Sequence, residues 1–222
     1  MSVQARHHSE SEPGHAAPGE LVDLRFRTLL GAHQWSALPP DIRARFSKRL
    51  GGNAAVTYVG RIATMQMSWA GRILSQALRL IGAPLPICLD SDVASIVTVT
   101  EDAATGGQIW TRLYAKRAGF PQVIHSAKRF SGPTGLEEYI GFGVTMALRP
   151  SVEDGALIFR SAGYALNFGG IRLTLPGWLA PGALTVGHRA TGPGTFAFTL
   201  TLSHRLFGQL LYQEGHYRDE RS

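Results

Sequence analysis

Between Asp92 and the end of this 222-residue chain, apolar residues recur at every second position in segment after segment. A period of two is typical of a β-strand that buries one face. Short turn sequences join these segments, and no helical pattern lies between them. Parallel strands would need crossover connections of a dozen residues or more, so the pattern predicts antiparallel pairing. A meander of about nine such strands must curl or close on itself.

Turn signals and glycines within strands indicate a strongly curved sheet. Asp154-Gly155 lies between two alternating segments and is the strongest hairpin signal in the chain. Gly141, Gly143 and Gly163 fall inside strand patterns, where glycine favours a bulge or a sharp bend. A Gly- and Pro-rich stretch, NFGGIRLTLPGWLAPG, separates that hairpin from the last two predicted strands.

One segment before Asp92 has helical spacing instead. From Ser68 to Ile81 the apolar residues form one wide stripe, and Gly82 and Pro84 end the helix. We expect this amphipathic helix to pack on the sheet. The alternative is a helix on a membrane surface, but two arginines are few for that role. The stripe consists of Trp69, Ile73, Leu74, Ala77, Leu78 and Ile81.

The N-terminal part of the chain contains shorter elements. Residues 1–20 have almost no apolar content, which predicts a disordered tail ahead of a single domain over residues 21–218. A short helix is expected to end at Gly31, and a second to begin at Pro39. A long strand, AAVTYVGRIATMQ, should then run to Met67.

These elements predict an α+β protein of mostly antiparallel β-structure. The expected architecture is a strongly curved sheet or barrel, calycin-like or helix-grip-like, with one main amphipathic helix packed on it and short N-terminal helices. Small barrels of this type often enclose one apolar ligand. A cavity inside the barrel is therefore the expected ligand site.

Charge and composition exclude several classes of partner. The formal net charge is +6, which invites a nucleic-acid or membrane partner, but the arginines are scattered and no Lys/Arg block occurs. No nucleic-acid partner and no membrane-surface contact are therefore expected. No Cys/His pair has metal-ligand spacing, so neither a metal nor another cofactor is expected.

The single cysteine and the lack of long apolar runs bear on location. Cys88 is the only cysteine, so no intramolecular disulfide can form, and a reducing compartment is the simplest expectation. The N-terminus has no apolar segment typical of a secretory signal, and no apolar run is long enough to span a bilayer. We therefore expect a cytoplasmic protein.

The hairpin HSAKRFSGPTGLEEYIGFG carries charged residues on a mostly apolar face. A loop over residues 131–135 sets Lys128 opposite Glu138 and Arg129 opposite Glu137, which predicts one cross-strand salt bridge on each face of the sheet. The face with Lys128 and Glu138 is the more apolar, so this pair is expected inside the barrel. The alternative, a solvated surface ion pair, stays open at this stage.

Further candidate site residues lie on other strand patterns. Trp110, Arg112 and Tyr114 share one face of a strand, and an arginine between two aromatic rings suits an anionic or planar polar ligand group. The alternative is an arginine that lies along the outside of the barrel. Ser126 does not lie in the G-x-S-x-G motif that holds the nucleophile of many hydrolases, so it is not expected to act as a nucleophile. His188 could act as a general base, but a hydrogen-bonded structural histidine is the favoured interpretation.

Short motifs occur along the chain in a fixed order: FRTLLGAHQWSALPPDIRARF, RLIGAPLP, IWTRLY, SAKRFSGPTGLEEYIGFG, EDGALIFRSAGY, LPGWLAPG and GTFAFTLTL. In this order they resemble a bacterial family, domain of unknown function 4166, over nearly the whole chain after the N-terminal tail. The resemblance implies one intact domain and a bacterial origin, and no established activity, cofactor or catalytic residue. Members stand alone or follow a saccharopine-dehydrogenase-like reductase domain. This chain has no G-x-G-x-x-G fingerprint of such a reductase.

Three functions are compatible with these patterns. The first is a small-molecule binding domain, whose barrel holds an apolar or amphipathic ligand by its polar end. The second is a cofactor-free cyclase or isomerase that uses Glu138 or His188 for proton transfer. The third is an interaction module for a partner reductase. No catalytic residue is assigned, and the expected ligand-binding residues are Trp110, Arg112, Tyr114, Ser126, Lys128, Glu138 and His188.

Overall fold

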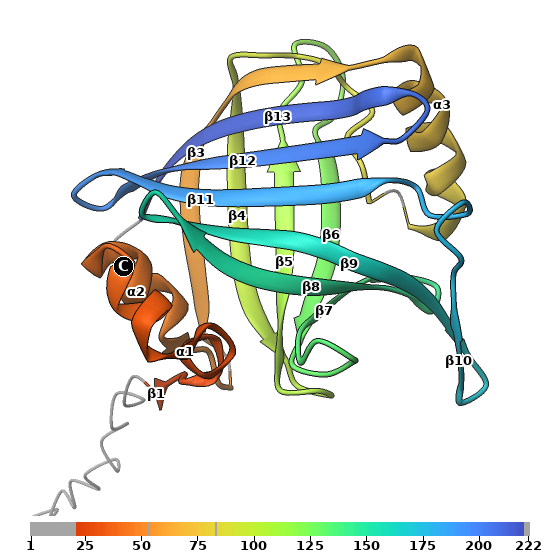
Figure 1. Cartoon of the computed structure of the whole chain (residues 1–222). Coiled ribbons are helices and arrows are strands. Elements are labelled where there is room, and N and C mark those ends of the chain that lie inside the picture. The colour runs from red at the N-terminus through yellow and green to blue at the C-terminus, as the bar shows by residue number, and fades with distance from the viewer. Residues whose placement is uncertain (1–20, 53, 83, 220–222) are drawn as a thin grey trace, which may run out of the picture.

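Ten antiparallel strands close into a barrel in the computed structural model, which describes residues 21–52, 54–82 and 84–219 (Figure 1). The tail predicted for residues 1–20 lies outside the described residues. Pairing follows the order β9-β11-β12-β13-β3-β4-β5-β6-β7-β8, and β8 pairs back with β9. The strands are β3 (Ala55–Met67), β4 (Val93–Asp102), β5 (Gly107–Tyr114), β6 (Gln122–Arg129), β7 (Glu137–Gly141), β8 (Val144–Glu153), β9 (Ala156–Phe168), β11 (Ala183–Gly192), β12 (Thr195–His204) and β13 (Gly208–Asp219).

The antiparallel barrel predicted from the alternating pattern is thus confirmed, and it is closed. Strand β10 (Ile171–Thr174) was not predicted, because it lies in the Gly- and Pro-rich stretch; it extends the sheet beside β9. Two further short strands, β1 (Leu21–Val22) and β2 (Lys48–Arg49), pair only with each other in the described part of the chain.

The predicted turn and bends appear where the glycines lie. Asp154 and Gly155 both have positive φ, 47° and 71°, as the two central residues of a type I′ hairpin turn require, and they join β8 to β9. Gly163 has φ of 137° beside a register shift between β8 and β9, and Gly141 has φ of 123° beside another between β7 and β8. These irregularities bend the strands enough for the sheet to close.

Helices α1 (Arg25–Ala37) and α2 (Pro40–Phe46) cover one end of the barrel, where they pack on β8 and β11 (Figure 1). Phe26, Ile42 and Phe46 are fully or almost fully buried there, and the Phe26 ring lies edge-on to Phe46 at 5.1 Å. The second helix begins at the prolines, as predicted. The first helical segment ends at Gly31, as predicted: Gly31 has φ of 76°, and a second helical segment follows this kink within α1.

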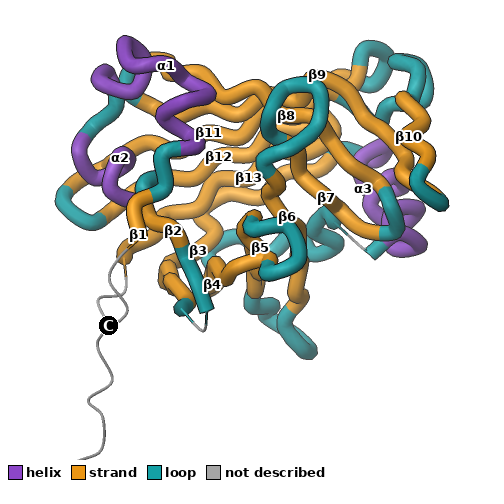
Figure 2. The backbone as a smooth tube through the Cα atoms, turned by 90° about the horizontal axis from the view of Figure 1, so that it is seen from below, coloured by secondary structure: helices purple, strands orange, loops and turns teal. Residues whose placement is uncertain are grey.

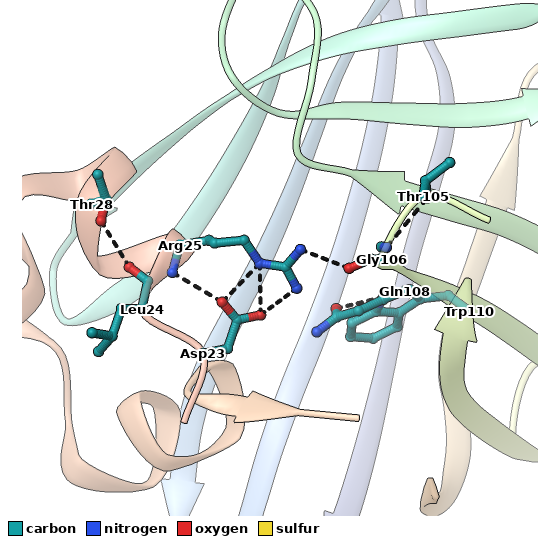
Figure 3. Close-up of polar contacts among 9 residues, drawn as sticks. Asp23, Leu24, Arg25, Thr28, Thr105, Gly106, Gln108 and Trp110 are labelled. Carbon is teal, nitrogen blue, oxygen red and sulfur yellow. Dashed lines mark hydrogen bonds and ion pairs between the residues drawn. The ribbon is translucent and has the colours of Figure 1, made fainter. Parts of the chain in front are cut away.

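Polar contacts tie the start of α1 to the barrel (Figure 3). The Arg25 guanidinium binds the Asp23 carboxylate, with Nη2 at 2.7 Å from Oδ2, and its Nη1 donates to the backbone oxygen of Gly106 at 2.6 Å. Gly106 lies in the β4–β5 turn. Because Asp23 is buried, its charge needs this partner, and the pair fixes the first turn of α1 on the barrel.

Helix α3 (Trp69–Ala77) and the 3₁₀ helix η1 (Leu78–Ile81) lie at the opposite end (Figures 1 and 2). The helix is present as predicted, but its orientation differs. Gly71 lies so close to β13 that a Cβ there would stand 2.1 Å from the Leu210 carbonyl oxygen. The helix therefore meets the barrel through Gly71 and the buried Ser75, with Leu74 and Leu78 partly buried beside them.

The expectation that the whole apolar stripe of α3 packs on the sheet is therefore wrong. Trp69 and Ile73 point outward, with 68% and 63% of their surfaces exposed. Small residues let the helix backbone approach the sheet closely, and this contact, rather than the largest apolar side chains, sets the helix rotation. Within the described residues, no helix is both long and apolar enough to cross a membrane.

Candidate functional site

A cavity lies inside the barrel, next to η1 and the loop that follows it. Its volume is about 80 Å³. Its apolar wall includes Leu78, Leu85, Ile124, Met146, Phe198 and Leu202. Its polar wall consists chiefly of Arg112, Tyr114, Ser126, Lys128, Glu138 and Gln213. An apolar space bounded on one side by charged groups is the usual form of a site for an amphipathic molecule.

Lys128 and Glu138 face each other inside this cavity. They are directly opposite in the β6–β7 register, and the Lys128 Nζ donates to the Glu138 Oε2 at 3.2 Å. Their residues are only 4% and 7% exposed. The prediction of an inward pair is confirmed, and the alternative of a solvated surface pair is wrong.

Arg112 and Ser126 extend this pair into a cluster. Arg112 Nη1 donates to the Ser126 hydroxyl at 3.0 Å, and that hydroxyl donates to Glu138 Oε1 at 2.5 Å. Arg112 Nη2 lies 3.7 Å from the same carboxylate oxygen. The arrangement follows from the sheet: β5 pairs with β6 and β6 with β7, so inward residues of three neighbouring strands converge. We call Arg112, Ser126, Lys128 and Glu138 the ion cluster.

The ion cluster carries an excess of positive charge. Burial alone would raise the pKa of the Glu138 carboxyl, but the charges of Lys128 and Arg112 and the hydrogen bonds from Ser126 and Lys128 outweigh it and lower that pKa to about 2. Burial lowers the pKa of the Lys128 ammonium, an effect that Glu138 opposes and Arg112 increases. With Glu138 ionised by its cationic neighbours, the cluster holds two positive groups and one negative group.

The outward pair of the same hairpin behaves differently. Arg129 and Glu137 are opposite in register, as predicted, but the salt bridge expected between them is not formed. Arg129 Nε binds the Asp102 carboxylate at 3.2 Å, and Glu137 Oε2 accepts from Arg172 Nη1 at 2.8 Å. Asp102 ends β4 and Arg172 lies on β10, so both partners come from segments outside the hairpin.

Trp110 lies beside the cavity rather than in its wall. Its indole Nε1 donates to Gln108 Oε1 at 3.2 Å (Figure 3), and Lys128 Nζ stands 4.9 Å from its ring centre. Such a cation–π contact stabilises the buried ammonium. Trp110 also lines a second, very small cavity of about 10 Å³, together with Arg112 and His188. Of the seven predicted site residues, the main cavity thus gathers Arg112, Tyr114, Ser126, Lys128 and Glu138 in its wall.

His188 is packed among aromatic rings, apart from the main cavity wall. Phe46 and Phe198 lie edge-on to its ring at 5.2 Å each, and the ring is almost fully buried. Its Nδ1 has no hydrogen-bond partner among the described residues, so the predicted hydrogen-bonded histidine is wrong at this nitrogen. Burial, reinforced by the charges of Lys128, Arg45 and Arg112, holds its pKa well below the usual range. The ring is neutral at neutral pH.

Two polar residues of the cavity wall were missed by the sequence analysis. Gln213 is completely buried; its Nε2 donates to the Tyr114 hydroxyl at 3.3 Å, and its Oε1 has no partner among the described residues. Tyr164 donates to the Gly182 carbonyl oxygen at 2.9 Å, and burial raises its pKa to about 12. Gln213 shares the inward face of its strand with the apolar Leu211. A polar residue at an inward position of an alternating strand is therefore the sequence feature that could have identified it.

Metal ligands are not grouped in the described part of the chain. No three His, Cys, Asp or Glu side chains there lie together as a metal site would require.

The fold and the cavity define a closed antiparallel β-barrel with an interior ion cluster. The chain belongs to the family described as Domain of unknown function (DUF4166), whose sequence profile matches residues 38–217. The resemblance seen in the sequence motifs is thereby confirmed. No curated protein matches the chain.

Two solved structures are distantly similar. The crystal structure of Rv2717c from M. tuberculosis has a TM-score of 0.40 and 14% identity, and the match covers 83% of this chain and 99% of that chain. The crystal structure of a mutant of the fluorescent protein UnaG has a TM-score of 0.32 and 10% identity, over 75% of this chain and 95% of that chain. Both similarities are too distant to carry an argument about a ligand.

Proposed function

We propose that this protein binds one small amphipathic molecule inside the barrel, with a negatively charged end at the ion cluster and an apolar body toward η1. The observation that supports this most strongly is the buried excess of positive charge at one side of an apolar cavity. A buried charge without a partner is costly, so an anionic group that joins Arg112 and Lys128 would be favoured.

Two polar groups of the wall, the Arg112 guanidinium and the Gln213 Oε1 that is unpartnered among the described residues, indicate which groups the ligand should carry. The Arg112 guanidinium offers a fixed fork of donors, which suits a planar carboxylate. Gln213 Oε1 has no donor among the described residues and would accept one from the ligand. A ligand with a carboxylate and a nearby hydroxyl or amide would satisfy both groups. The cavity is smaller than the roughly 300–1,000 Å³ of pockets for drug-sized ligands, so a long ligand requires the α3 end to move outward.

Proton transfer is less well supported by the same geometry. A general base works best with a pKa near the operating pH. The pKa of Glu138 is about 2, and His188 is not among the residues that line the main cavity. A function as a cyclase or isomerase is therefore less well supported than a function in ligand binding. Location in the cytoplasm and a partner reductase stay predictions from the sequence.

The binding proposal is tested with the purified protein in two steps. Native mass spectrometry first shows whether a small molecule is retained after purification. Ligand-observed NMR then compares decanoate, decanol and decylamine, which share one chain and differ in the charge of the head group. We expect decanoate to bind at least about tenfold more tightly than the other two, since a charge-assisted hydrogen bond contributes about 1.5–3 kcal/mol.

A pair of variants identifies the residue responsible. Arg112→Gln should remove the preference for decanoate. Arg160→Gln is the matched control, because Arg160 is half exposed in an ion pair with Glu153 and does not line the cavity. Equal binding of all three probes, or an unchanged preference in Arg112→Gln, would contradict the proposal.

A further inference from the structure

Large apolar side chains gather on the surface at the α3 end. Trp69, Ile73, Leu80, Leu206 and Phe207 are each more than half exposed. The first three lie on α3 and η1, and the last two in the turn between β12 and β13. The Trp69 and Phe207 rings meet edge-on at 5.7 Å, so the two segments form one continuous surface. We call these five residues the α3 patch.

The surroundings of the α3 patch are basic. Arg72 and Arg79 are exposed on α3 and η1, and Arg205 is exposed in the β12–β13 turn. None of the three forms an ion pair with a described residue. The sequence has no Asp or Glu between residues 62 and 89, nor between residues 155 and 213. Every segment that builds the patch is thus free of negative charge.

More apolar side chains extend this surface at the same end. Trp178 and Leu179 are more than half exposed in the loop that leads from β10 to β11. A groove between that loop and the residues His204 and Arg205 connects them to the β12–β13 turn. Figures 1 and 2 both place α3 and β10 at the end of the barrel opposite to α1.

We propose that the α3 patch docks on the surface of an anionic lipid bilayer. Trp69, Phe207 and their aliphatic neighbours enter the head-group region, where aromatic rings are favoured, and the three arginines bind the negatively charged head groups. The inference goes beyond ligand binding and does not depend on it, although η1 also forms part of the cavity wall, so the ligand site lies next to the docked surface.

Charge complementarity favours a bilayer over a second copy of the chain. A symmetric dimer through this surface would set the arginines of one copy against those of the other, and the segments that build the patch contain no acidic residue to pair with them. An anionic bilayer offers both an apolar layer and negative charge. The proposal departs from the sequence-based expectation of no membrane contact, because that expectation placed the stripe of α3 against the sheet, where Trp69 and Ile73 would be buried.

Vesicle flotation tests the proposal with the full chain. We expect the protein to float with phosphatidylcholine vesicles that contain about 30% phosphatidylglycerol and to stay behind with pure phosphatidylcholine, with binding that weakens as salt rises. Trp69→Ser with Phe207→Ser should reduce the partition coefficient at least tenfold. Each of Arg72→Gln and Arg79→Gln should reduce it about fivefold, the factor that corresponds to about 1 kcal/mol per basic residue.

Controls at the other end of the barrel separate docking from general stickiness. Leu24 and Arg27 are exposed at the start of α1, so Leu24→Ser and Arg27→Gln remove the same kinds of side chain at a site remote from the patch. Both should bind vesicles like the wild type, and all variants should retain the wild-type melting temperature within a few degrees. If the wild-type protein does not bind anionic vesicles, the proposal is wrong. It is also wrong if the control variants lose as much binding as the patch variants. Either result would favour a protein partner for the α3 patch.

Discussion

Helices cover both ends of the barrel, but the large apolar side chains of these helices are buried at one end and partly exposed at the other. At the α1–α2 end, Phe26, Ile42 and Phe46 are buried against the barrel. At the α3 end, Gly71 makes the close contact, and Trp69 is left outside. Helical periodicity therefore identifies an amphipathic helix without showing which part of its surface meets the sheet. In α3, the small size of the residues at the contact determines which face packs on the sheet.

The largest expected contrast between the ends is in stability. Phe26→Ala should lower the free energy of unfolding by about 3–5 kcal/mol, because it opens a cavity in a completely buried aromatic cluster. Trp69→Ala should change it by less than about 0.5 kcal/mol, because an exposed side chain loses little on truncation. Urea unfolding of the two variants measures both values. Losses of similar size would mean that Trp69 is packed and that the two ends do not differ.

A smaller effect is expected where α3 touches β13. Gly71→Ala should lower the free energy of unfolding by about 1–3 kcal/mol, because the new Cβ would overlap the Leu210 carbonyl oxygen and force the helix outward. Alanine's better helix propensity would offset up to about 1 kcal/mol of this loss. Gln76→Ala, on the exposed face of the same helix, is the matched control and should be nearly neutral. A stabilised Gly71→Ala would show that α3 does not pack through this face.

The smallest effect is a pH dependence that belongs to the α1–α2 end. His188 packs on Phe46 and has a pKa in the folded state well below that in the unfolded chain, which is about 6.5. Below about pH 6.5 the unfolded state therefore binds one more proton, so stability falls as pH falls, by about 1.4 kcal/mol per pH unit. His188→Phe should remove this slope.

Urea unfolding of the wild type and His188→Phe between pH 7 and 5 measures the difference. This window lies above the range in which Glu138 titrates, since the stability due to its depressed pKa is lost only from about pH 4.5 down to about pH 2. Parallel stability curves for the two proteins would show that His188 is not buried in a neutral state.

The sequence predicted features that depend on neighbouring residues and missed those that depend on distant ones. Lys128 and Glu138 were placed correctly, because a short loop fixes their register and a period of two fixes their face. The partners of Arg129 and Glu137 were missed, because they come from β4 and β10. The strand β10 itself was hidden by the glycines and prolines around it.

The same rule holds for the candidate site. Five of the seven expected residues line the cavity because each lies on the inward face of a strand that alternation had identified. Trp110 and His188 are inward too, but Phe198 and their other aromatic neighbours form a separate small cavity around them. No local pattern shows where side chains from several strands divide an interior into two spaces.

The proposed ligand site depends on the buried ion pair of Lys128 and Glu138, which a double-mutant cycle can test. The variants are Lys128→Met, Glu138→Leu and the two combined, measured by urea unfolding in low and high salt. Lys128→Met leaves a carboxylate in the cavity with only Arg112 and Ser126 as partners. The loss should be about 3–5 kcal/mol, and the double variant should recover much of it.

The coupling energy between positions 128 and 138 shows whether the ion pair is buried. We expect a coupling of several kcal/mol that changes little between about 0.05 M and 1 M salt, because buried charges are poorly screened. A coupling below about 1 kcal/mol that disappears in high salt is the behaviour of a solvated surface pair. That result would contradict the buried ion cluster and the ligand site built on it.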